Sequence, residues 1–179
     1  MNDLNPSIFI VPSIALSFVI LLYVYFAKNV RDKRNYRYYI FELAVGAFLM
    51  NFIWELAQGP LYEGFEYDWK HISFCGLASI ADMLMVLILL YGFGLVYKNV
   101  FWIQKMGKSK ALPLILFGTT GAILAELWHT AKGDWLYAET MPLLPIVDVG
   151  ILPVLQFAIL PWLLFSLSMK YENEKNLEM

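Results

Sequence analysis

The chain has 179 residues, of which 60% are apolar and 16% are charged. Soluble domains carry about 45–50% apolar and about 25% charged residues, so this composition excludes an ordinary soluble fold and favours a membrane protein. The net charge of −2 argues against a nucleic-acid-binding protein, and the single cysteine excludes an intrachain disulfide and a CxxC motif.

Five segments contain the roughly 20 mostly apolar residues that a membrane-spanning helix needs. In chain order they are residues 7–27, 38–58, 72–97, 111–131 and 147–169. No basic region precedes the first segment and a basic cluster follows it, so we expect a retained span rather than a signal peptide. The predicted fold is therefore an all-α bundle of five transmembrane helices, a single domain over residues 1–179 with a polar cytoplasmic tail at 170–179.

The basic residues predict the orientation of these spans. Eleven of the thirteen follow the first, third and fifth spans, and the opposite ends carry only Lys70 and Lys132. The eleven are Lys28, Arg31, Lys33, Arg34, Arg37, Lys98, Lys105, Lys108, Lys110, Lys170 and Lys175. Cytoplasmic loops are enriched in Lys and Arg, so we predict an N-terminus outside, a C-terminus inside and a multi-pass protein of the bacterial inner membrane.

The sequence also contains a short internal repeat. Glu55-Leu56 is followed by Leu61-Tyr62, and Glu126-Leu127 is followed by Leu136-Tyr137. Both segments lie at the outer end of an outward-running span. We predict that spans two–three and four–five are related helical hairpins, arranged as a parallel repeat with a site between them.

Polar side chains gather in the outer halves of the predicted spans, at matching depths on different helices. Ionisable groups inside a bilayer are costly and usually functional. The predicted catalytic carboxyl groups are those of Glu55, Asp82 and Glu126. The residues predicted to bind or orient a substrate are Asn51, Gln58, His129, Gln156, Trp54, Trp128, Trp135 and Tyr137. Two alternatives stay open: interhelical hydrogen bonding for the amides and an interfacial aromatic belt for the outer loops.

Metal binding has weaker support in the sequence. Glu126 and His129 have the i, i+3 spacing of di-iron bundles, but such sites need two of these motifs. His71 and Cys75 do not form a closed zinc pattern. We therefore predict no cofactor, with a metal at these four residues as an alternative.

Two motifs carry a resemblance to known proteins. Trp54-Glu55-x-x-Gln58-x-Pro60-Leu61-Tyr62 and Gly133-x-Trp135-x-Tyr137-x-x-x-Met141-Pro142 resemble motifs of an uncharacterised family of small bacterial integral membrane proteins. More remotely, they are similar to lycopene-cyclase-domain proteins and membrane terpene cyclases, in which intramembrane carboxylates act as acids. The paired acidic signature that follows Gly-x-Trp-x-Tyr in lycopene cyclases is missing here, with Gln156 nearest to its place.

These observations predict an outward-opening carboxylate site that performs acid–base chemistry on a lipid or isoprenoid. Neighbouring carboxyl groups in a low-dielectric space can hold one proton between them, which acid–base catalysis requires. The expected partner is a lipid or another apolar small molecule within the membrane, with homo-oligomerisation left open. The alternatives are a proton-coupled transporter and a non-enzymatic subunit or assembly partner.

Overall fold

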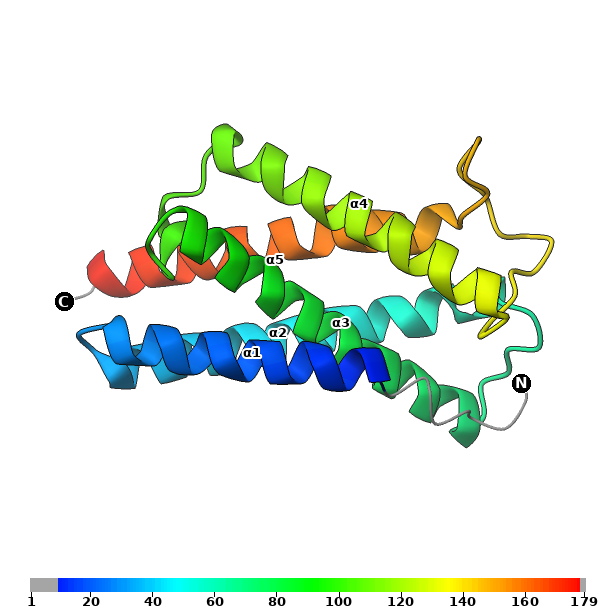
Figure 1. Ribbon diagram of the computed structural model, residues 1–179, viewed down its shortest axis with the longest axis horizontal. Coiled ribbons are helices and arrows are strands. Elements are labelled where there is room, and N and C mark those ends of the chain that lie inside the picture. Colours follow the sequence, from blue (N-terminus) through cyan, green and yellow to red (C-terminus); the bar gives the residue numbers. More distant parts are fainter. Residues whose placement is uncertain (1–9, 178–179) are drawn as a thin grey trace.

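The computed structural model describes residues 10–177, without the side chains of Lys105 and residues 169–177. Its five long helices are α1 (Ile10–Asn29), α2 (Lys33–Gln58), α3 (Trp69–Val96), α4 (Lys108–Lys132) and α5 (Ile151–Leu177) (Figure 1). Two short 3-10 helices, η2 (Gly59–Leu61) and η3 (Trp102–Lys105), lie in the connections. Each of the five helices is long and apolar enough to cross a membrane. The predicted all-α fold with five membrane-spanning helices is thus confirmed.

Helix ends differ from the predicted spans where local chemistry decides them. α2 begins at Lys33, before the predicted 38, because the Asp32 side chain accepts hydrogen bonds from the backbone N–H groups of Arg34 and Asn35, each at 2.9 Å. α5 begins at Ile151 rather than 147, because Asp148 has a positive φ of 53° that a helix excludes. α5 also continues through the predicted tail to residue 177. Residues 7–9 and 178–179 lie outside the described residues.

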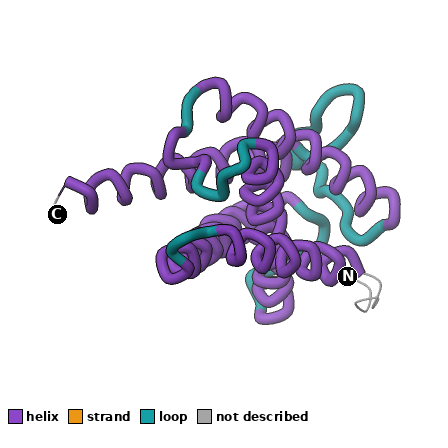
Figure 2. Tube along the Cα trace, turned by 60° about the vertical axis from the view of Figure 1, so that its left-hand side comes forward, coloured by secondary structure: helices purple, strands orange, loops and turns teal. Residues whose placement is uncertain are grey.

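The helices form two antiparallel hairpins with one additional helix. α2 packs along α3, and α4 packs along α5. α1 lies against α3, and α2 also contacts α5, whereas α3 and α4 contact each other little (Figures 1 and 2). The hairpin of α4 and α5 is therefore joined to the rest of the bundle mainly through α5.

The two hairpins share one register of buried residues. Buried positions of α2 recur in α4 at an interval of 71 residues: Leu43 and Leu114, Ala47 and Gly118, Asn51 and Ala122. Buried positions of α3 recur in α5 at an interval of 74 residues: Val86 and Leu160, Leu90 and Leu164, Tyr91 and Phe165. Related helices thus use corresponding faces for packing, as a repeat requires.

The outer connections pair with each other at corresponding residues of the repeat. Tyr62 and Tyr137 form an isolated antiparallel bridge. The N–H of Glu63 donates to the carbonyl of Leu136, and the N–H of Ala138 donates to the carbonyl of Leu61, both at 2.9 Å. In each bond, the residue that follows one tyrosine donates to the residue that precedes the other. The outer loops therefore meet with local two-fold symmetry.

A packed aromatic core fills the half of the bundle nearest the basic connections, which we call the inner half. Tyr36, Tyr91, Trp102 and Phe165 are fully buried there. The hydroxyls of Tyr36 and Tyr91 are hydrogen-bonded at 3.2 Å, and the Trp102 indole donates to the carbonyl of Leu90 at 2.9 Å. The inner half is therefore closed by packing, and the polar side chains lie in the opposite, outer half.

Candidate functional site

Gln156 joins polar side chains of three helices in the outer half. It lies on the second turn of α5 and is 1% exposed. Its Nε2 donates to Asn51 Oδ1 at 2.8 Å, to Asp82 Oδ2 at 2.9 Å and to Glu55 Oε1 at 3.2 Å. One amide thus holds an amide and a carboxyl group of α2 and a carboxyl group of α3.

A second glutamine completes the network from α2. Gln58 lies one turn above Glu55 and donates to Glu55 Oε1 at 2.8 Å. Its Nε2 also donates to Gln156 Oε1 at 3.1 Å, and its own Oε1 accepts from the Trp54 indole at 3.2 Å. Because Asn51, Glu55 and Gln58 follow the helical repeat, their side chains share one face of α2.

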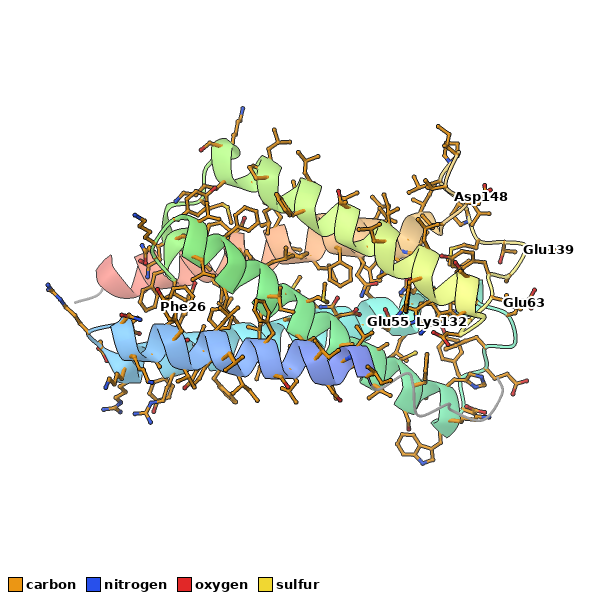
Figure 3. All side chains as sticks on the ribbon, viewed as in Figure 1. Phe26, Glu55, Glu63, Lys132, Glu139 and Asp148 are labelled. Carbon is orange, nitrogen blue, oxygen red and sulfur yellow. The ribbon has the colours of Figure 1, made fainter. Side chains whose placement is uncertain are left out.

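The carboxyl groups of Glu55 and Asp82 are brought together, because both accept from the Nε2 of Gln156. An ionised carboxylate can only accept, so a hydrogen bond between two carboxyl groups needs a proton on one of them. Both residues are half-buried, and Glu55 lies inside the bundle whereas Glu63, Glu139 and Asp148 project from the outer loops (Figure 3). The pair is therefore arranged to share one proton between two helices.

Glu126 has its own set of hydrogen bonds on α4, and no hydrogen bond of the described residues joins it to the pair. It is buried on α4, and its Oε2 accepts from the Tyr137 hydroxyl and from the Trp135 indole, the latter at 3.2 Å. His129, one turn along α4, stacks on Trp135 with ring centroids 4.3 Å apart. The His129 Nδ1 lies 2.7 Å from a carboxylate oxygen of Asp134.

Tyr62 is the site residue that the sequence analysis did not include. Its ring contacts those of Tyr137 and Trp135, with centroids 5.6 and 6.4 Å away. Burial, followed by the charges of Glu126 and Glu55, raises the pKa of its hydroxyl above the ordinary value. The internal repeat could have identified Tyr62 as a site residue, since Tyr62 corresponds to the predicted site residue Tyr137.

The hydroxyl of Tyr62 is not fully enclosed. Among the described residues it has no hydrogen-bond partner, although the residue is half-buried. Every fully buried side-chain nitrogen and oxygen in this part of the chain does have a partner. The unpartnered hydroxyl of Tyr62 therefore keeps some accessible surface.

Three predicted residues lie elsewhere. Trp128 is 55% exposed on α4, with the Lys132 ammonium 4.4 Å above its ring, so the structure does not place it among the carboxyl groups. His71 pairs with Asp68 at 2.8 Å at the start of α3. Cys75 is buried one turn further along. Over residues 10–177 no three His, Cys, Asp or Glu side chains are grouped closely enough to hold a metal ion.

The three carboxyl groups have no basic partner among the described side chains. The ion pairs found there are those of His71 with Asp68 and of His129 with Asp134. Amides, an indole and tyrosines surround the acids instead. Neutral donors leave each carboxyl group able to gain or lose a proton without breaking an ion pair.

Comparison of the chain with protein-family models, with curated proteins and with solved structures finds no match. The geometry of the site is therefore the basis on which a function can be proposed.

Proposed function

We propose that the protein is a membrane enzyme that performs acid–base chemistry on an apolar lipid or isoprenoid reaching the site from the outer leaflet. The observation that carries this proposal is that Gln156 holds the carboxyl groups of Glu55 and Asp82, from two different helices, on one amide nitrogen. Carboxyl groups of two helices sharing a proton provide a donor and an acceptor in one place.

The simplest reaction of this class is a proton shift within the substrate. The protonated member of the pair gives its proton to one carbon of a double bond, which leaves a cation on the other carbon. The second member of the pair, a carboxylate, then removes a proton from the carbon on the far side of that cation. The double bond moves, no electrons are gained or lost overall, and the pair ends with one proton as it began. Asn51, Gln58 and Gln156 orient the pair, and Glu126 with Trp135 and Tyr137 offers negative charge and aromatic faces to a cationic intermediate.

The packing of the inner half favours an enzyme over a transporter. A carrier that alternates between the two sides needs polar groups along both halves of its path. Here the inner half is filled by Tyr36, Tyr91, Trp102 and Phe165, whereas the carboxyl groups lie in the outer half. A substrate that enters and leaves on the outer side suits this arrangement.

The test follows deuterium from solvent into lipid, so that no substrate needs to be known beforehand. The purified protein is placed in bilayers of total bacterial inner-membrane lipid in D₂O, and the lipids are analysed by mass spectrometry. We expect one lipid class to gain carbon-bound deuterium. General acid–base groups contribute about 10²–10⁴-fold, so Glu55→Gln and Asp82→Asn should each reduce incorporation at least a hundredfold.

Glu42→Gln is the matched control, because Glu42 is an exposed carboxyl group on the same helix, far from the pair. It should keep wild-type incorporation, and all three variants should show the wild-type melting curve or be excluded. Incorporation that persists in both Glu55→Gln and Asp82→Asn overturns the proposal. Proton-coupled flux across liposomes without any labelled lipid would instead support the transporter.

A further inference from the structure

Protons for a buried carboxyl pair must come from water, and the outer end of α4 holds a suitable pair of residues. The side chains of His129 and Asp134 are 20% and 21% exposed, so both touch solvent. Asp134 accepts from the Nδ1 of His129 at 2.7 Å, which leaves Nε2 as the nitrogen that binds and releases a proton. Histidine changes its charge near neutral pH more readily than any other side chain.

The histidine is held beside Glu126 rather than free to swing in solvent. His129 and Glu126 are three residues apart and share one face of α4. The Trp135 ring lies against the imidazole at an interplanar angle of 21°, and the same indole donates to Glu126. Trp135 therefore fixes the imidazole and the carboxyl group relative to each other.

The Tyr62 ring contacts Tyr137 and Trp135, the two residues that donate to Glu126. The charges of Glu126, Glu55 and Asp82 all act on its hydroxyl. A tyrosine hydroxyl keeps its proton over the physiological range and can accept one proton while releasing another. Its lack of a fixed hydrogen-bond partner leaves the hydroxyl free to rotate.

A second pair of a histidine and an aspartate lies at the start of α3 and serves as a comparison for His129 and Asp134. His71 and Asp68 are 2.8 Å apart, but Asp68 is 48% exposed and the His71 ring packs against Phe65. No ring of the described residues joins this pair to a carboxyl group of the cluster, as Trp135 joins His129 to Glu126. This pair matches the pair on α4 in composition and in the distance between its polar atoms but not in its neighbours.

We infer that His129, oriented by Asp134, is the entrance of a proton path that leads through Glu126 and Tyr62 to the Glu55–Asp82 pair, an inference that rests on the proposed function of that pair. His129 takes a proton from outer water at Nε2 and passes it to the Glu126 carboxylate. The Tyr62 hydroxyl accepts this proton from Glu126 and releases its own to the Glu55–Asp82 pair. Each step moves one proton and leaves every relay residue as it began.

The experiment measures how fast the carboxyl proton of the pair exchanges with D₂O, by time-resolved infrared spectroscopy of the protein in lipid nanodiscs. The carboxyl C=O band of the pair is assigned as the one that Asp82→Asn and Glu55→Gln remove. We expect His129→Ala to slow the exchange of this band at least tenfold, in line with the contribution of a positioned acid–base group. Imidazole added to the buffer should restore at least part of the rate, because it replaces the missing proton carrier without repairing the fold.

Matched variants separate proton transfer from structure. His71→Ala should exchange at the wild-type rate. Tyr62→Phe should slow exchange at least tenfold, whereas Tyr67→Phe, which changes an exposed tyrosine of the same loop, should not. Wild-type exchange in His129→Ala overturns the inference, and so does slow exchange that imidazole leaves unchanged.

The outcome is separable from that of the proposed function, since proton exchange needs no substrate. Slow exchange in His129→Ala together with unlabelled lipids would support the path and reject the enzyme. Labelled lipids with unchanged exchange in His129→Ala would support the enzyme and reject the path.

Discussion

Replacing Gln156 with leucine tests whether the polar network holds the outer half together. The substitution keeps the approximate volume but removes both amide hydrogens and the carbonyl oxygen. The two hydrogens serve three acceptors, on Asn51, Asp82 and Glu55, and the oxygen accepts from Gln58. At least two acceptors lose their donor, and each buried polar group left unpaired costs about 1–3 kcal/mol, so Gln156→Leu should destabilise the protein by about 2–6 kcal/mol.

Thermal unfolding in detergent, followed by circular dichroism, provides the measurement. A loss of 2 kcal/mol shifts the midpoint of a chain of this size by about 4–8 °C, so we expect a decrease of at least about 4 °C. Thr120→Leu is the control, because Thr120 is an exposed polar residue of α4 outside this network. An inconsequential surface change is expected to shift the midpoint by no more than about 1 °C. A Gln156→Leu midpoint within about that margin of the wild type would refute the view that these contacts stabilise the fold.

Gln156→Glu sharpens the same test. It places a third carboxyl group against Glu55 and Asp82, where like charges repel unless they are protonated. The stability deficit relative to the wild type should therefore be large at neutral pH and shrink as the pH falls. The leucine variant removes the donor without adding charge, so its deficit should change less with pH.

Three further changes have defined expectations. Gly118→Ala should destabilise the protein by about 1–3 kcal/mol in thermal unfolding, because a Cβ there would lie 2.4 Å from a backbone carbonyl oxygen of α5, whereas Gly121→Ala meets nothing within 4 Å and should be neutral or stabilising. Asp32→Ala should cost about 1 kcal/mol of stability through loss of the α2 cap, and Asp32→Asn should retain most of it. Burial raises the pKa of Tyr62 and of Tyr137, so the folded state keeps protons that the unfolded state releases near pH 10; stability should be constant below about pH 10, fall above it, and fall less in the double phenylalanine variant.

The five helices were predictable because membrane spans are defined by length and apolarity alone. The faces that Asn51, Glu55 and Gln58 share were equally predictable from the helical repeat. The sequence does not state which helices are neighbours, so the joining of three helices by Gln156 became visible only in the structure. The helix start at Ile151 was missed because an apolar sequence hides a change of backbone conformation at Asp148.

The positions of Trp128 and Tyr62 differ from those expected from the sequence for two physical reasons. Trp128 was grouped with Glu126 because the two are close in sequence, but two residues correspond to about 200° of rotation around a helix, which places them on different faces. The exposure of the Trp128 ring agrees with that rotation. Tyr62 was read as part of an interfacial belt, because its approach to the carboxyl groups depends on the pairing of two loops 75 residues apart.

The differences between the two hairpins explain how a repeated unit can form a single site. Asp82 and Gln156 occupy corresponding positions, and a second aspartate in place of Gln156 would leave four acids in the outer half with no cation beside them. Gln58 and His129 correspond at the same interval of 71 residues that relates the buried faces of α2 and α4. In the first hairpin this position holds an amide that donates to Glu55, and in the second it holds an imidazole that reaches solvent. On the proposed function, the first hairpin contributes the two acids that share a proton, and the second contributes Gln156, which holds them, and His129, which supplies the proton, so the site needs residues of both hairpins.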